Sequence, residues 1–533
     1  MEVRAPVEKE QWGTRLGVIL AVAGSAVGLG NFLRFPGQAV NNGGGAFMIP
    51  YFIALVLVGI PIGWAEWTMG RYGGRYGVHS TPAIMGIVGK GRTSRYVGVL
   101  GLLVPLVIYM YYGLIESWCL RYAWEYVSGG ASLGGDPAAY AEASKNLFVD
   151  VTGSGQDGVI FQGSLHPSVV FWIIVFALNI WLVHRGLSKG IEAFTRIAMP
   201  AMAICAVIVL VRVLTLGTPD PAHPERNVVD GLGFMWNPDL SKLGDFDTWL
   251  AAAGQIFFSL SVGFGVIINY ASYLSKKDDV VLSGLTAAST NELFEVSFGG
   301  LITVTAAFVF LGASGAAGGT FGLGFQTLPV VFEYMGPAGR WIGATWFFML
   351  FLAAITSSLS MLQPVKAFLQ EALGVGSRGA SGILALVAGA GGLWVIYFSK
   401  DLAALDTMDF WVGTFGIFVL ATVQIILFGW VLGVDKGLRE AHLGAELRIP
   451  RAVRFVIKYV SPLYLLIVFA GFCIQQLPSY VSGLEGNDVA RATVLVIVLV
   501  LGLLTVMTFF GERRWRARGI DVDGEREPEE EGG

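Results

Sequence analysis

Long runs of apolar residues without a charge recur along this chain, and they constrain its fold more than any other feature. Three examples are "YFIALVLVGIPIGW" (Tyr51–Trp64), "VVFWIIVFALNIWLV" (Val169–Val183) and "VLVIVLVLGLLTVMTFF" (Val494–Phe510). A helix needs about 20 such residues to cross a bilayer, and a segment in lipid must satisfy its own backbone hydrogen bonds. Only 14% of the 533 residues are charged, against roughly a quarter in soluble proteins. The chain is therefore predicted to be an all-α polytopic membrane protein.

The basic residues predict the orientation of the chain. The long loop 128–167 carries one basic residue, Lys145, whereas the segment after the second span carries five: Arg71, Arg75, Lys90, Arg92 and Arg95. Because basic loops stay on the cytoplasmic side, both termini are expected in the cytoplasm and the chain in the cell (inner) membrane. The polar, acidic end of the chain, residues 512–533, is expected to be a disordered cytoplasmic tail.

Two glycine-rich interruptions fall inside apolar segments. "SAVGLG" (Ser25–Gly30) recurs as "LSVGFG" (Leu260–Gly265) five spans later, so the second copy enters the membrane from the opposite side. Such a pair is typical of inverted-repeat transporters, whose site lies where the two broken helices meet. Glycines that only allow close helix packing are the alternative. The polar neighbours Asn31 and Gln255 favour a binding site, because unwound backbone in a membrane is tolerated where it lines a cavity.

Several longer strings identify a family that these breaks fit. They are "GNFLRFP", "NGGGAFMIPY", "EWTMGRYGG", "GQIFFSLSVGFG", "NYASY", "LSGLTAA" and "TSSLSMLQP". With them the chain resembles, over nearly its whole length, the neurotransmitter:sodium symporter family, and most closely its bacterial leucine transporter. The resemblance implies twelve transmembrane helices, the first ten forming an inverted five-helix repeat with helices 1 and 6 broken. It also implies sodium-coupled uptake of amino acids or related amines.

The resemblance divides the chain into six parts. They are a cytoplasmic N-terminal segment (1–11), a first half-repeat with helices 1–5 (12–215), an extracellular loop (216–245), a second half-repeat with helices 6–10 (246–433), helices 11 and 12 (434–511) and the tail (512–533).

The resemblance further implies two sodium sites and no organic cofactor. The first sodium would be bound by Ala26, Asn31, Ser259 and Asn291 together with the carboxylate of the substrate. The second would be bound by Gly24, Val27, Ala353, Thr356 and Ser357. These neutral oxygen ligands suit sodium, and the substrate carboxylate would offset its charge, so each partner lowers the cost of burying the other. The alternative for "TSS" is hydroxyl groups that bond back to their own helical turn.

The substrate would be a zwitterionic amino acid. Its contacts, carried over from the family, would be Ser25, Ala26, Gly28, Gly30, Ile108, Tyr112, Phe258, Ser259, Ser261, Phe264, Ser357 and Met361. Gly28 stands where monoamine carriers of the family have an aspartate, so a neutral, apolar amino acid is favoured, aliphatic rather than aromatic. Substitutions at Ser25, Ile108, Ser259 and Met361 relative to the leucine transporter leave alanine, valine, leucine and methionine all open.

Three glutamates in apolar spans and two gates complete the expectations. Glu295 occupies a position where chloride-dependent members have a serine, so its carboxylate predicts chloride-independent transport. The alternative is a protonated acid bonded within the bundle, and for Glu66 and Glu116 a structural role is preferred.

The predicted outer gate consists of Arg34, Tyr112, Gln255, Phe258 and Asp409. The predicted inner gate consists of Lys9, Trp12, Tyr273 and Glu371, and "GIEAFTRIAMP", with Gly190 and Pro200, is expected to unwind locally or only to kink.

Other functional classes fit the sequence less well. The five histidines (His79, His166, His184, His223 and His442) are scattered and form no ligand or catalytic pattern, so the chain is not expected to be an enzyme. A channel, a transporter-like sensor and proton coupling are the remaining alternatives. The lipid bilayer and a small neutral amino acid are the expected partners, nucleic acid is not one, and a homodimer is left open.

Overall fold

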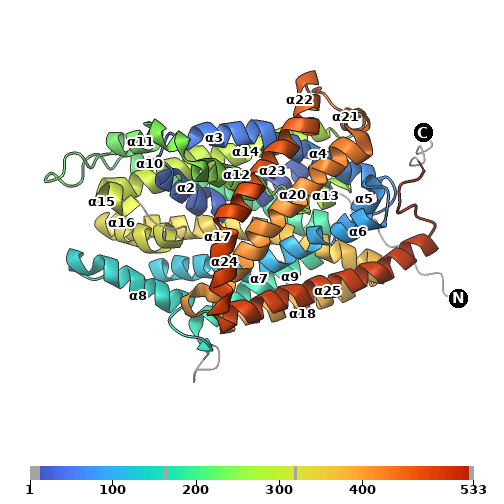
Figure 1. Cartoon of the computed structure of the whole chain (residues 1–533). Coiled ribbons are helices and arrows are strands. Elements are labelled where there is room, and N and C mark those ends of the chain that lie inside the picture. The colour runs from blue at the N-terminus through green and yellow to red at the C-terminus, as the bar shows by residue number, and fades with distance from the viewer. Residues whose placement is uncertain (1–11, 160–164, 317–320, 527–533) are drawn as a thin grey trace.

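The computed structural model describes residues 12–159, 165–316 and 321–526, with no statement on the side chains of 314–316. Within these residues every regular element is helical (Figure 1). Ten helices are long and apolar enough to span a membrane, and the bent pair that opens the chain adds an eleventh. The broken pair α12 and α13 gives the twelfth, so the predicted all-α architecture is confirmed.

The first half of the chain contributes five spans. They are α1 (Arg15–Ala26) with η1 (Gly30–Arg34) and α2 (Phe35–Asn41); α3 (Met48–Ala54), η2 (Leu55–Gly59) and α4 (Ile60–Gly74); α6 (Arg92–Val97) with α7 (Leu100–Ser128); α9 (Pro167–His184); and η5 (Leu187–Glu192) with α10 (Ala193–Leu214). Short helices α5 (Thr81–Val88) and α8 (Tyr140–Thr152) lie between spans, and α11 (Val228–Trp236) follows the fifth.

The second half contributes the other seven. They are α12 (Phe246–Leu260) with α13 (Val266–Ala271); α14 (Val280–Glu292), η7 (Leu293–Val304) and α15 (Thr305–Ala316); α17 (Pro337–Leu373); α18 (Ser377–Tyr397); α19 (Ala403–Met408), η10 (Asp409–Gly416), α20 (Ile417–Ile426), η11 (Leu427–Gly433) and α21 (Val434–Ala441); α22 (Arg451–Phe455), η12 (Val456–Val460), α23 (Ser461–Gln475) and α24 (Leu477–Glu485); and α25 (Asp488–Ala517). Helix α16 (Leu328–Tyr334) precedes α17.

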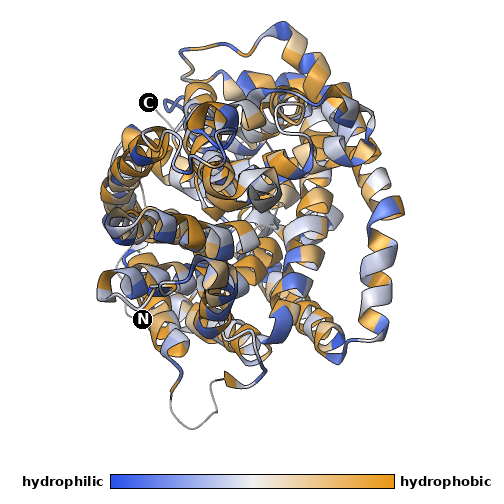
Figure 2. Ribbon diagram, turned by 90° about the vertical axis from the view of Figure 1, so that its left-hand side faces the viewer, coloured by the Kyte–Doolittle hydropathy of each residue, from blue (hydrophilic) through white to orange (hydrophobic). Residues whose placement is uncertain are grey.

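Burial separates central helices from peripheral ones. The apolar stretches of α7 and α17 are 94% and 83% buried, and the two helices pack along one another, whereas the stretch of α25 is only 28% buried. Apolar residues run along the helices throughout the bundle (Figure 2). Because the outward apolar faces have no protein partner, they are the surface that meets lipid.

Both predicted breaks are present. Helix α1 ends at Ala26, and Val27 adopts an extended conformation (φ −75°, ψ 92°). Helix α12 ends at Leu260, after which Ser261, Gly263 and Gly265 all have positive φ (54°, 77° and 80°). Glycine is required at 265, because a Cβ there would lie 2.5 Å from the carbonyl oxygen of Gly101. The interruptions are therefore breaks of the backbone and not only packing glycines.

The expectation of a disordered tail from residue 512 is wrong for residues 512–526. Helix α25 continues to Ala517, the Trp515 and Val522 side chains are buried, and residues 518–526 lie beside α5 and α6 (Figure 1). The fully buried Arg95 pairs with Glu512 at 2.8 Å and with Asp523. The acidic composition suggested a solvated tail, but two of its acids neutralise a buried arginine. Residues 527–533 lie outside the described residues.

Candidate substrate and sodium site

A buried polar cluster lies where the broken first helix meets the sixth and seventh spans. The Asn31 amide nitrogen donates to Asn291 Oδ1 at 2.8 Å, and the Asn291 amide nitrogen donates to Ser259 Oγ at 2.6 Å. Asn31, from η1, also stabilises the break itself, because its Oδ1 accepts the Gly28 backbone N–H at 2.8 Å. The structure thus brings together three of the four residues expected at the first sodium.

Glu295, from η7, is the acceptor on which this cluster converges. Its carboxylate accepts from Gln255 Nε2 at 2.6 Å, from Asn31 Nδ2 at 3.1 Å, from Asn291 Nδ2 at 3.2 Å and from Ser259 Oγ. Among the described residues no lysine, arginine or histidine forms an ion pair with it. The side chain is fully buried. A charge here can be offset only by a cation or by a proton.

The end of α1 supplies backbone oxygens that the helix itself cannot satisfy. The last carbonyl groups of a helix have no intrahelical donor. Ser357, from α17, donates to the carbonyls of Gly24 and Ser25 at 3.3 and 3.2 Å, and Ser261 donates to Ser25 at 3.1 Å. The carbonyl oxygens of Gly24, expected at the second sodium, and of Ser25, expected at the substrate, therefore face hydroxyl groups across the break.

The hydroxyl groups on α17 behave in two ways. Thr356 donates to the carbonyls of Leu352 and Ala353 at 3.1 and 3.0 Å, which is the alternative predicted for "TSS". Ser357 also reaches its own turn at Ala353, at 3.2 Å, but it contacts the broken helix as well. Ser357 Oγ thus faces the end of α1, and Thr356 lies next to Gly24, since a Cβ at Gly24 would be 3.3 Å from Thr356 Cβ. Val27 is fully buried at the break.

Gly28 lies where helices 1, 3 and 8 come closest. A Cβ added at Gly28 would lie 2.7 Å from Ser357 Oγ and 3.0 Å from Tyr112 Oη. The Tyr112 hydroxyl, from α7, accepts the backbone N–H of Leu29 at 3.2 Å. A Cβ at Gly30 would lie 2.8 Å from the ring of Phe258. A side chain at position 28 would therefore require the Ser357 or Tyr112 hydroxyl to shift.

The apolar residues expected around the substrate are inside the bundle. Ile108, Phe264 and Met361 are all buried, and Phe258 is half-buried. The rings of Phe258 and Phe264 meet edge to face with their centroids 6.2 Å apart. Phe258, near the end of α12, thus contacts Phe264, which lies in the segment between α12 and α13.

The predicted outer ion pair is not formed. The Arg34 guanidinium lies 4.6 Å from the centre of the Phe258 ring, and Asp409 accepts a hydrogen bond from Tyr111 Oη at 2.7 Å. In the described part of the chain no nitrogen of Arg34 lies within 4.0 Å of the Asp409 carboxylate. Gln255, the amide of the predicted outer gate, donates from Nε2 to Glu295 at 2.6 Å. Aromatic rings hold both charged groups apart.

Of the four residues of the predicted inner gate, Lys9 lies outside the described residues, whereas Trp12, Tyr273 and Glu371 lie within them. The Trp12 indole N–H donates to the carbonyl of Tyr270 at 3.1 Å, while Tyr273 stacks on His79 at a centroid distance of 4.0 Å. Glu371 accepts from the Ser80 N–H at 3.2 Å and from the backbone N–H of His79, both at the start of α5. Trp12 therefore braces helix 6 through Tyr270, and Glu371 caps a neighbouring helix.

Sequence reasoning missed Glu192, which holds the start of α1. Its carboxylate accepts from the Gly13 N–H at 2.7 Å and from Thr14 Oγ1 at 2.9 Å, and it pairs with Arg196 at 2.8 Å. Glu192 is buried. The available signal was an acid followed four residues later by an arginine, inside the string "GIEAFTRIAMP".

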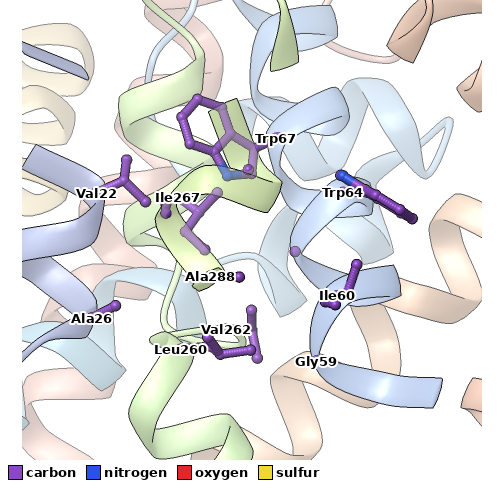
Figure 3. A pocket seen from close by; sticks show the side chains of 13 residues that line it. Val22, Ala26, Gly59, Ile60, Trp64, Trp67, Leu260, Val262, Ile267 and Ala288 are labelled. Atoms are coloured by element: carbon purple, nitrogen blue, oxygen red, sulfur yellow. The ribbon is translucent and has the colours of Figure 1, made fainter. Parts of the chain in front are cut away.

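A small apolar pocket lies beside the two breaks (Figure 3). Ala26 and Val262 come from the breaks, and Gly59 and Ile60 face them from the second span. The Trp64 indole N–H donates a hydrogen bond to the carbonyl oxygen of Val281 at 3.0 Å. The side chains of this lining offer no ligand for an ion, and Ala26, whose carbonyl is expected at the first sodium, is the lining residue that the pocket shares with the predicted site. Within the described residues no group of three or more histidines, cysteines or acids could hold a metal ion.

Known proteins match this chain across both halves of the bundle. The sequence matches the sodium:neurotransmitter symporter family over residues 9–131 and 140–514. A sodium-dependent transporter of Methanocaldococcus jannaschii, itself described as uncharacterized, is 30% identical over 469 residues, covering 86% of this chain and 89% of the relative. The sodium-dependent nutrient amino acid transporter 1 of Drosophila grimshawi is 25% identical over 517 residues, covering 87% of this chain and 76% of the relative.

A solved structure has a fold similar to that of this chain. The crystal structure of MhsT in complex with L-phenylalanine aligns with a TM-score of 0.74 and 27% sequence identity, covering 87% of this chain and 99% of MhsT. The aligned share is large enough to include most of the bundle that carries the polar cluster.

Proposed function

Because this chain belongs to the sodium:neurotransmitter symporter family, we propose that it imports a neutral, apolar, aliphatic amino acid together with sodium. The resemblance inferred from the sequence motifs is confirmed, and so is the interpretation of the chain as a transporter and not an enzyme. It is a sodium-dependent transporter that crosses the membrane many times. The substrate, the number of sodium ions and the chloride independence are the proposed parts.

The observation that carries the proposal is the convergence of neutral oxygens at the two breaks. Asn291 is within hydrogen-bond distance of both Asn31 and Ser259, and the carbonyls at the end of α1 are turned toward Ser357 and Ser261. Sodium is a hard cation that binds such oxygens. One sodium would bind at Ala26, Asn31, Ser259 and Asn291, and a second at Gly24, Val27, Ala353, Thr356 and Ser357.

The substrate carboxylate would supply the missing ligand of the first sodium. It would bind the backbone amides around Gly28 and the hydroxyl of Tyr112, while the ammonium would bind carbonyls of Ala26 and Phe258. Gly28 supports an amino acid over a monoamine, because a glycine at this position supplies no carboxylate to pair with the amine. Burial of Ile108 and Met361 supports an apolar side chain.

Chloride independence is proposed on the position of Glu295. Its carboxylate is bonded to the Asn31, Asn291 and Ser259 side chains and could supply the anion that other members take from solution. The negative charge would then balance the sodium beside it. A protonated Glu295 is the alternative, and it would leave the sodium to the substrate carboxylate alone.

Transport would proceed by alternating access. Sodium and substrate would enter past Arg34 and Phe258, the outer side would close, and the start of α1 would then separate from Glu192. Each sodium that enters a negative interior contributes roughly 2.3 kcal/mol per 100 mV. With both termini in the cytoplasm of a cell (inner) membrane, the direction is uptake.

Uptake into proteoliposomes tests the proposal. Purified full-length protein is reconstituted, and accumulation of radiolabelled leucine, alanine, valine and methionine is measured with an inward sodium gradient and with potassium in its place. At least one amino acid should accumulate only with the sodium gradient. Equal accumulation in potassium would reject sodium coupling. Counterflow of labelled substrate separates a transporter from a sensor, because a sensor binds but exchanges nothing across the bilayer.

An aromatic substrate is the second candidate, because the solved neighbour MhsT was crystallised with L-phenylalanine. The aromatic pair Phe258 and Phe264 beside the break is compatible with it. A competition screen of the twenty amino acids against sodium-dependent binding decides between the two. Phenylalanine or tryptophan as the strongest competitor would replace the aliphatic assignment, and aspartate or a monoamine would contradict both.

A further inference from the structure

A buried hydrogen-bond chain joins three spans outside the proposed ligand sets. Asn179, from α9, donates from Nδ2 to both carboxyl oxygens of Glu116, from α7, at 3.0 and 3.2 Å. Ser358, from α17, donates from Oγ to Asn179 Oδ1 at 2.9 Å. All three side chains are fully buried. The sequence alone suggested no more than a structural role for Glu116.

The two ends of this chain lie next to residues of the proposed site. Glu116 follows Tyr112 by one helical turn on α7, and Ser358 adjoins Ser357 on α17. Successive residues of a helix point about 100° apart. A rotation of α17 that broke the Ser358 bond would therefore also turn Ser357 away from the carbonyls of Gly24 and Ser25.

A second contact fixes α9 to α17 further along the same helices. Lys366 Nζ donates to the carbonyl oxygen of Val183 at 3.0 Å, one turn beyond Asn179 on α9. Two contacts at different heights oppose both rotation and sliding of α17. Helix α9 is thus a brace for the helix that carries Thr356 and Ser357.

The chemistry of Glu116 indicates a hydrogen-bonding role and not an ionic one. Among the described residues it forms no ion pair with a lysine, arginine or histidine. An unpaired carboxylate inside a membrane bundle is strongly disfavoured, whereas the neutral acid keeps its hydrogen bonds at little cost. Glutamine has nearly the same shape and keeps one neutral oxygen that can accept from Asn179, so it should replace glutamate here.

We infer that neutral Glu116, Asn179 and Ser358 form a positioning chain that holds the hydroxyl groups of α17 in place for the second sodium. The inference rests on the proposed function, because it assumes that Thr356 and Ser357 bind sodium. None of the three residues touches the ion. They act on it through the orientation of α17, as outer-shell partners orient metal ligands elsewhere.

The test is the binding of radiolabelled sodium to purified full-length protein, with the affinity for labelled amino acid at saturating sodium as a second readout. Ser358→Ala and Glu116→Leu should raise the half-saturating sodium concentration about 10-fold, the lower end of known outer-shell effects. Their affinity for the amino acid at saturating sodium should be unchanged. Glu116→Gln should keep the half-saturating sodium concentration of the wild type.

Ser360→Ala is the matched control, because it removes another buried hydroxyl of α17, whose bond goes to the Thr356 carbonyl of its own helix at 3.0 Å. Wild-type sodium binding in both Ser358→Ala and Glu116→Leu would overturn the inference, as would damage in Glu116→Gln equal to that in Glu116→Leu. If Glu116→Leu does not fold, Ser358→Ala and Glu116→Gln still decide the question. A wild-type protein that binds no sodium would instead reject the proposed function.

Discussion

Asn31 donates a hydrogen bond to Asn291 across 2.8 Å, and through this contact the broken first helix is tied to the seventh span. The same Asn31 side chain accepts the Gly28 N–H inside the break. One residue thus stabilises the unwound backbone and connects it to the opposite half-repeat. A ligand that binds at this point contacts both halves at once, which is what coupling between ion binding and helix movement requires.

A methyl group at Gly28 should abolish tight substrate binding. The added Cβ of Gly28→Ala would lie 2.7 Å from Ser357 Oγ and 3.0 Å from Tyr112 Oη, so one of these hydroxyl groups must shift. We expect the Kd for the amino acid to rise at least about 10-fold, or about 1.4 kcal/mol. Sodium-dependent binding of labelled substrate measures it. Gly63→Ala is the control, because its Cβ would meet Val262 Cγ1 only at 3.9 Å. Equal Kd values for the two variants would contradict the assignment of Gly28.

Replacing Glu295 with serine should create a need for chloride. In the wild type the carboxylate supplies the negative charge, so uptake should be the same in chloride and in gluconate. In Glu295→Ser that charge is gone, and uptake should occur in chloride only. Glu292→Gln is the control, since this carboxyl group is bonded to Tyr51 at 2.7 Å and should bring no chloride dependence. Loss of wild-type uptake in gluconate would show that Glu295 does not act as the anion.

Removing Glu192 should loosen the cytoplasmic start of α1. The Gly13 N–H and the Thr14 hydroxyl would lose a charged acceptor, and bonds of this kind contribute about 1.5–3 kcal/mol. Hydrogen–deuterium exchange of residues 12–20 in Glu192→Ala should therefore be at least about 10-fold faster than in the wild type. Glu446→Ala removes an exposed partner of Arg15 and should change little. If the exchange rates of residues 12–20 are unchanged in Glu192→Ala, Glu192 does not hold the start of α1.

Neutralising Asp523 should lower thermal stability. Arg95 is fully buried and would lose one of its two carboxylate partners in Asp523→Asn. Breaking a buried pair costs about 3–5 kcal/mol, and the 20% exposure of the Asp523 side chain reduces the expected loss to about 1–3 kcal/mol. The midpoint of thermal unfolding in detergent measures it. The control is Glu525→Gln, which changes an exposed residue near Asp523 and should leave the midpoint unchanged. Equal midpoints for the two variants would contradict the packing of residues 512–526 against the bundle.

Much of the site could be predicted because its signals are local. The breaks at Val27 and Ser261 follow from glycines inside apolar runs, and the strings around Asn31 and Asn291 identify the residues that converge on Glu295. The gates could not be predicted in this way. Arg34 and Asp409 have opposite charges, but whether they pair depends on where the Phe258 and Tyr111 side chains lie between distant spans.

The packing of residues 512–526 also could not be predicted from the sequence. Composition describes the average solvation of a segment, and residues 512–526 are polar on average. Their packing depends on two apolar side chains, Trp515 and Val522, and on a buried arginine more than 400 positions earlier in the chain. Glu192 was missed for a related reason, because its partners belong to the first residues of another span.

The central claim is that sodium and the substrate carboxylate stabilise one another at the two breaks. The most direct measurement is the Kd of the amino acid as a function of sodium concentration in purified protein, with the half-saturating sodium concentration measured with and without amino acid. The account predicts that sodium lowers the Kd and that the amino acid lowers the sodium requirement by the same factor. A Kd that is the same in sodium and in potassium would contradict it.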